Sequence, residues 1–195
     1  MKIFDLYETG SVKVEDPGLR RYINLNEKLL LKFHGREREK FGRAKVNTLA
    51  RFINLLTNPG HRGRKHKIMT HWASGKWSKK AAVMIKTLNI ISEKTKENPI
   101  QVFVKAIENA ASRDEITTIE YGGARYPQAV DISPMRRLSL SMRNLAHGAY
   151  DKCFGKNVKL ENALASEIIA AYQNSSESKA IAKKNETEKM ADSSR

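Results

Sequence analysis

The sequence predicts a mainly α-helical, single-domain protein: a bundle of about six helices with one β-hairpin that protrudes between the third and fourth helices. Several segments between residues 45 and 172 carry apolar residues every three to four positions, as on the buried face of a helix. Helix-capping residues precede several of these segments. Only residues 115–132 show the alternation typical of strands, around a Gly-Gly pair.

The first 44 residues are expected to form an N-terminal extension. They are mixed in composition, with short apolar pieces, a turn signal at Asp16-Pro17-Gly18 and a charged run over residues 36–40. We expect this extension to wrap over the rest of the chain with little core of its own. Residues 45–195 would then form the helical domain.

Three helices are predicted before the hairpin. The first covers residues 45–57 and ends at Asn58-Pro59-Gly60. A basic loop with two tryptophans follows over residues 61–77, and Ser78 can cap a second helix that runs to about residue 96. Asn98 and Pro99 supply the cap and the first residue of the third helix. The expected apolar stripes are Val46, Leu49, Phe52, Ile53 and Leu56, then Ala81, Ile85, Leu88 and Ile91, and then Ile100, Phe103, Ile107 and Ala110.

The hairpin is predicted over residues 115–132. Gly122 and Gly123 form its turn, because a tight hairpin turn needs the positive φ angles that glycine adopts. Pro127 cannot donate to a strand ladder, so the second strand is an edge strand or belongs to a two-stranded ribbon. Neither face carries a continuous apolar row, so we expect the hairpin to stand away from the core.

The fourth helix is predicted to begin directly after the hairpin, with Ser133 as its cap and Pro134 at its first position. Arg136 and Arg137 lie in its first turn, where positive charge opposes the helix dipole. A bound phosphate would compensate, and because the whole chain is basic we interpret both arginines as phosphate ligands rather than as solvated charges. A fifth helix is expected over residues 160–172 and a tail helix over residues 178–195.

The charge balance indicates a polyanionic partner. The 195 residues include 36 Lys and Arg against 21 Asp and Glu, for a net charge of +15 at pH 7. Nucleic acid is the first candidate and an anionic membrane surface the second, although no apolar run approaches the ~20 residues that span a bilayer. A single cysteine excludes an internal disulfide, and the first ten residues are not typical of a signal peptide. We therefore expect a reduced, cytoplasmic protein without membrane partners.

Basic residues concentrate in two parts of the sequence, which favours structured RNA over a single groove of B-DNA. RNA is recognised by shape, by its phosphates and 2′-hydroxyls, and by aromatic side chains that stack on splayed bases. Trp72, Trp77, Tyr121 and Tyr126 stand among these basic residues and could stack, although at least one tryptophan is expected in the core. The candidate RNA ligands are Lys45, Arg51, Arg62, Arg64, Lys65, Lys67, Lys76, Lys79 and Lys80 around the first two helices, and Arg113, Arg136, Arg137 and Arg143 around the hairpin and the fourth helix.

Catalytic, metal and cofactor sites are not expected. Nucleophile-elbow, Walker-type and dinucleotide-binding motifs are missing, and no acid pair stands in an apolar neighbourhood. His61, His66 and His71 are five residues apart, whereas zinc on one helix face needs spacings of three or four. Cys153, beside Phe154, is interpreted as a packing residue rather than as a nucleophile.

Two other functions stay open from these residues. A DNA-binding regulator that uses the first two helices would need a short helix-turn-helix connection, whereas residues 58–77 form a long one. An RNA-processing enzyme would need a cluster of acids, which the sequence does not present.

Several blocks resemble the seventh small-subunit ribosomal protein family. The likeness depends on EKTKENPIQVFVKAIENA (residues 93–110), YPQAVDISPMRRLSL (126–140), IAKKNETEKM (181–190) and VNTLARFINLL (46–56), and it covers about residues 43–195. The N-terminal DPGLRRYINL is similar to the archaeal and eukaryotic branch of the family. Residues 58–77 depart from bacterial members, in which this loop is shorter.

The resemblance implies a six-helix bundle with a long hairpin that binds the 3′ major domain of small-subunit rRNA and helps to nucleate the head of the subunit. It implies that the hairpin lies near the exit-site tRNA and the mRNA exit channel, beside neighbouring proteins of the head and platform. The family's basic helix start falls on Arg136 and Arg137. The residues expected at the hairpin tip are Gly122, Gly123, Ala124, Arg125 and Tyr126, of which only Arg125 is charged.

Overall fold

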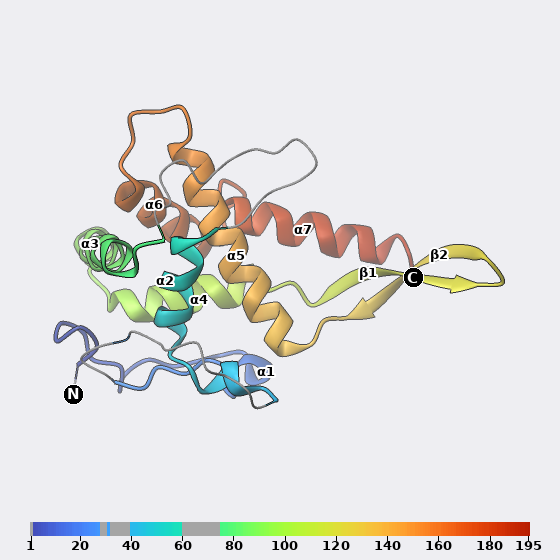
Figure 1. Cartoon of the computed structure of the whole chain (residues 1–195), viewed down its shortest axis with the longest axis horizontal. Helices are drawn as coiled ribbons and strands as arrows, with labels where there is room; N and C mark the ends of the chain where they lie inside the picture. Colours follow the sequence, from blue (N-terminus) through green and yellow to red (C-terminus); the bar gives the residue numbers. More distant parts are fainter. Residues whose placement is uncertain (1, 28–30, 32–39, 60–74) are drawn as a thin grey trace.

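Helices α2 to α6 form a body from which a single β-hairpin extends, as Figure 1 shows for this computed structural model. The structure describes residues 2–27, 31, 40–59 and 75–195. The described elements are α1 (Pro17–Arg20), a 3₁₀ turn (Gly42–Lys45), α2 (Thr48–Thr57), α3 (Trp77–Thr95), α4 (Pro99–Ala110), β1 (Asp114–Tyr121), β2 (Ala124–Asp131), α5 (Pro134–Cys153), α6 (Leu160–Tyr172) and α7 (Lys179–Asp192). The predicted fold class, mainly helical with one protruding hairpin, is confirmed.

The position of the hairpin in the helix order differs from the prediction by one. It lies between α4 and α5, because Asp16-Pro17-Gly18 begins a short helix, α1, and is not only a turn. The Asp16 side chain accepts a hydrogen bond from the backbone N–H of Gly18 at 2.8 Å, which satisfies a free donor of this helical turn. The predicted third and fourth helices are therefore α4 and α5.

The core is made by the apolar faces of the helices. Phe52 of α2 meets Phe103 of α4 edge to face, with ring centroids 5.1 Å apart. The residues of the predicted stripes are buried, with one exception in α3. There Met84 is buried in the core, and Ile85, which was predicted on the stripe, is only partly buried. Asn47 caps α2 by accepting from the backbone N–H of Leu49, so this helix begins after a 3₁₀ turn and not at residue 45.

The N-terminal extension contributes side chains to this same core. Ile3, Leu19, Ile23 and Leu31 are buried among the residues of the helices. The chain is also tied to α4 through backbone groups: Lys13 N–H donates to Gln101 at 2.8 Å, and the Gln101 amide donates back to the Lys13 carbonyl at 3.0 Å. The extension thus runs along the body as expected, and it also supplies part of the core.

The hairpin is a two-stranded antiparallel ribbon in perfect register from Asp114–Asp131 to Tyr121–Ala124. Gly122 and Gly123 have φ angles of 58° and 82°, the positive values predicted for the turn. Helix α7 runs from the body toward the base of the ribbon (Figure 1). There the Arg113 N–H donates to Glu188 at 3.0 Å, and Arg195 pairs with Asp114 at 2.5 Å. The C-terminal helix therefore supports the ribbon where it leaves the body.

Candidate nucleic-acid interface

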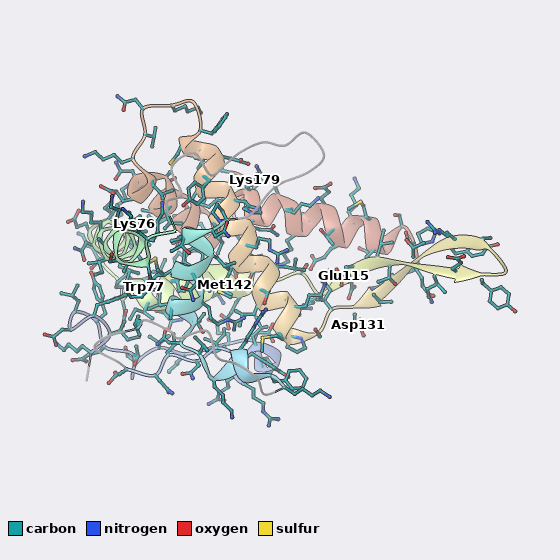
Figure 2. The ribbon with its side chains drawn as sticks, viewed as in Figure 1. Lys76, Trp77, Glu115, Asp131, Met142 and Lys179 are labelled. Carbon is teal, nitrogen blue, oxygen red and sulfur yellow. The ribbon has the colours of Figure 1, made fainter. Side chains whose placement is uncertain are left out.

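A groove between α2 and α5 carries three arginines above an apolar floor. It is lined by Arg43, Val46, Arg51, Asn54, Leu55, Ser139, Met142 and Arg143 and encloses about 320 Å³. Met142, labelled in Figure 2, comes from the middle of α5. Arg51 and Arg143 belong to the two different basic parts of the sequence, and the structure brings them together in one groove. The two arginines meet because α2 packs against α5, although these helices lie far apart in the sequence.

Arg51 is held in this groove by α5. Its Nη2 lies 3.3 Å from the Ser139 hydroxyl and 3.6 Å from the Met135 sulfur. The Ser139 hydroxyl donates a hydrogen bond to the Met135 carbonyl at 2.8 Å. This bond orients the hydroxyl oxygen of Ser139 that accepts from Arg51. Arg43 and Arg143 are exposed at the groove, where a phosphate could reach them. The groove therefore combines a positioned guanidinium with two accessible ones.

Arg136 and Arg137, predicted together as phosphate ligands, have different environments. Arg136 is exposed and makes a two-point ion pair with Glu115 of β1, at 2.7 and 2.8 Å. The hydrogen bond with the Glu115 carboxylate raises the pKa of Arg136 above its ordinary value. Arg137 is 11% exposed and donates to the Ser112 carbonyl at 3.1 Å and to Asp16 at 2.8 Å. Phosphate binding by this pair stays a prediction, and Arg137 in addition connects the body to the N-terminal extension.

Lys80, predicted as an RNA ligand, is much more buried than the other predicted ligands of α3. Its side chain is buried, with 5% of the residue exposed, and its Nζ lies 5.3 Å from the centre of the Tyr150 ring. Desolvation by this burial lowers the pKa of Lys80. The preceding residue, Lys79, is exposed, so the two neighbouring lysines lie on different faces of α3 and only Lys79 faces the solvent.

The remaining predicted ligands divide into two groups. Lys45, Lys76, Lys79 and Arg113 are exposed, and Figure 2 shows Lys76 and Trp77 at the start of α3, with Trp77 packed against the core. Four ligands of the basic loop, all three spaced histidines and one tryptophan lie outside the described residues, namely Arg62, Arg64, Lys65, Lys67, His61, His66, His71 and Trp72.

The hairpin tip is more apolar than its sequence indicated. Ile119 and Tyr126 are cross-strand partners, and Tyr121 stands two residues from Ile119 on the same face. These side chains are 45%, 58% and 82% exposed, respectively. Arg125, the predicted charge of the tip, lies 3.5 Å from Glu120 on the opposite face. Alternation along one strand already places Ile119 and Tyr121 on the same face, but only the register between the strands adds Tyr126 to it.

Sequence reasoning also missed a basic groove beside the N-terminal extension. Arg21, Lys40 and Lys45 line a cavity of about 630 Å³ together with the aromatic residues Tyr22 and Phe41. Phe41 is exposed, and its φ angle of 61° is rare for a bulky residue. Arg43 was missed as well, because it precedes the first predicted stripe and only the fold brings it beside Arg51.

Two structural findings concern other classes of ligand. Within the described ranges, no group of three or more His, Cys, Asp or Glu side chains is arranged to hold a metal ion. Helices long and apolar enough to cross a lipid bilayer are likewise missing from this part of the chain. The described surface thus offers basic and aromatic groups rather than a metal centre.

Comparison with known proteins gives a consistent result. The family model described as "Ribosomal protein S7p/S5e" matches residues 19–195, which includes most of the N-terminal DPGLRRYINL as well as residues 43–195. A protein of Nanoarchaeum equitans named "Small ribosomal subunit protein uS7" is 49% identical over 196 residues and covers 100% of this chain and 99% of that protein. A protein of Picrophilus torridus with the same name is 40% identical over 194 residues, with 99% and 98% covered.

Proposed function

The chain belongs to the ribosomal protein S7p/S5e family, and from this we propose that it is a structural, non-enzymatic component of the small ribosomal subunit that binds rRNA. In the structure itself, the single observation that carries the rRNA-binding part of the proposal is the groove between α2 and α5. There Arg43, Arg51 and Arg143 meet on a rigid helical body, as required for contact with phosphates of a folded RNA. In this role the protein works in the cytoplasm, within the ribosome.

Family resemblance gives the proposal its finer form. The rRNA partner is the 3′ major domain, whose folding into the head of the subunit the protein would help to nucleate. The ribbon would extend toward the exit-site tRNA and the mRNA exit channel. Its exposed Ile119, Tyr121 and Tyr126 offer apolar surface for tRNA bases or for the neighbouring head and platform proteins.

Electrostatics support a phosphate-rich partner. The net charge of +15 favours association with a polyanion at any orientation, whereas the groove brings three of the cations together and gives one of them, Arg51, a defined position. Because α5 holds Arg51 before RNA binds, little ordering of this side chain is needed.

A binding titration tests the proposal. The full chain is titrated against an RNA fragment that spans the 3′ major domain, at fixed moderate salt, with duplex DNA of equal length as competitor. We expect tight binding to the RNA that an about 100-fold excess of DNA does not displace. Equal competition by DNA would favour a DNA-binding regulator, and shortening of the RNA during incubation would favour an RNA-processing enzyme.

A further inference from the structure

We infer that the groove between α2 and α5 binds one unstacked nucleotide of the rRNA, with its base in the cavity and its phosphate on the arginines. This inference depends on the proposed function and makes it more specific. Phosphate binding needs charge alone, but the floor of this groove is made of Val46, Leu55 and Met142. An apolar floor below three guanidinium groups fits the two halves of a nucleotide, a flat base and a charged phosphate.

The cavity keeps its shape without a ligand. Val46 and Met142 are buried, so the floor is part of the packed core and not a set of mobile side chains. Arg51 is positioned by Ser139 and Met135 of α5. A site that is already formed loses little conformational freedom on binding, which favours a small, specific ligand such as one base.

The wall of the groove supplies polar groups that suit the edge of a base. Asn54 is exposed and lines the cavity, and its amide has both donors and an acceptor. Arg143 and Arg43 are exposed at the same groove, and a guanidinium plane can stack on a base as well as pair with a phosphate. The groove therefore combines guanidinium groups that can stack on a base, hydrogen-bonding groups and an apolar floor, three kinds of contact that suit single-stranded RNA.

Chemical probing of the complex tests this inference. The rRNA fragment is acylated at its 2′-hydroxyls, free and bound to the full chain, and its reactivity is read at each nucleotide. We expect one or two adjacent nucleotides to change reactivity on binding of the wild-type chain. Asn54→Trp, which fills the groove, should abolish this local change while the affinity falls by no more than about 10-fold, since other phosphate contacts stay. Asn162→Trp, at an exposed asparagine of α6, is the matched control and should keep the change.

A second variant protects the test against misfolding. Arg143→Lys keeps the charge of an exposed side chain but removes the planar group, so we expect an unchanged melting temperature and a weakened local change. Reactivity profiles that are identical for the wild type, Asn54→Trp and Arg143→Lys, with RNA still bound, would overturn the inference but leave the proposed function intact. Failure of the wild-type chain to bind the fragment would instead overturn the proposed function.

Discussion

Arg137 donates a hydrogen bond to Asp16 across 121 residues of sequence, with 2.8 Å between Nη2 and Oδ2. The same guanidinium donates through Nε to the Ser112 carbonyl at 3.1 Å. One side chain thus connects the N-terminal extension, the entry to the hairpin and the first turn of α5. The positive charge of Arg137 in the first turn of α5 opposes the helix dipole, and the carboxylate of Asp16 compensates this charge.

Removal of the Arg137 side chain should destabilise the protein. Arg137→Ala leaves Asp16 and the Ser112 carbonyl without this donor in a partly buried site, so we expect a loss of about 2 kcal/mol in the free energy of unfolding. For a chain of this length the melting temperature should fall by about 4–8 °C. Arg136→Ala is the matched control and should change stability less, because the Arg136 side chain is more than half exposed, whereas that of Arg137 is nearly covered. Equal melting temperatures for the two variants would contradict the connecting role.

The ion pair between Arg137 and Asp16 should also depend on pH. Desolvation raises the pKa of Asp16, but the hydrogen bond and charge of Arg137 and the N–H groups of Gly18 and Leu19 outweigh it, so the pKa is lowered from 3.8. A lowered pKa in the folded state stabilises the protein above pH 3.8, and this contribution is lost as the pH falls through the folded value. Burial raises the pKa of nearby Glu108, so the contribution of Asp16 must be isolated as a difference between variants.

The measurement is denaturant unfolding of the wild type and Asp16→Asn between pH 7 and pH 2.5. We expect the wild type to be more stable at pH 7, and the difference to shrink as the pH falls below about 4. Asp5→Asn, at an exposed aspartate, is the control. A difference that stays constant across this range would show that the charge of Asp16 does not contribute.

Gly148 of α5 allows close approach of the buried Glu167. A Cβ atom at this position would lie 2.5 Å from Oε1 and 2.6 Å from Cδ of Glu167. The carboxylate cannot easily move, because Ser178 and the Ala180 N–H donate to it at 2.8 and 3.2 Å, and Lys152 lies 2.7 Å away. These contacts hold the start of α7, so a displaced carboxylate would loosen this helix as well.

Gly148→Ala should therefore destabilise the protein by about 1–3 kcal/mol, although alanine normally stabilises a helix relative to glycine. Thermal unfolding checks this, with Gly10→Ala as the control, since an added Cβ there meets no atom within 4 Å. A melting temperature for Gly148→Ala at or above that of the wild type would contradict the packing argument.

The hairpin tip should affect subunit function without affecting primary binding of rRNA. Tyr121→Thr combined with Tyr126→Thr removes two exposed rings but keeps strand propensity. We expect the affinity for the rRNA fragment to stay within about 2-fold, as for other exposed substitutions. Small subunits assembled with the variant should retain exit-site tRNA less well. An affinity for the isolated fragment that falls more than about 10-fold would mean that the tip belongs to the primary site.

Local signals predicted most of the fold, because helix periodicity, caps and the Gly-Gly turn are properties of neighbouring residues. The short helix at Pro17–Arg20 was missed since a single helical turn has the same signature as a β-turn. The site was less accessible to sequence reasoning. Proximity of Arg51 to Arg143, the burial of Lys80 and the pairing of Arg137 with Asp16 all depend on contacts between distant segments, which residue spacing does not encode.

The salt dependence of rRNA binding tests the central claim, that the groove between α2 and α5 contacts RNA phosphates. The logarithm of the binding constant is measured against the logarithm of salt concentration for the wild type, Arg143→Gln and the control Lys94→Gln, an exposed cation in the last turn of α3. We predict a steep slope for the wild type that becomes shallower by about one for Arg143→Gln and is unchanged for Lys94→Gln. Equal slopes for all three proteins would contradict the claim.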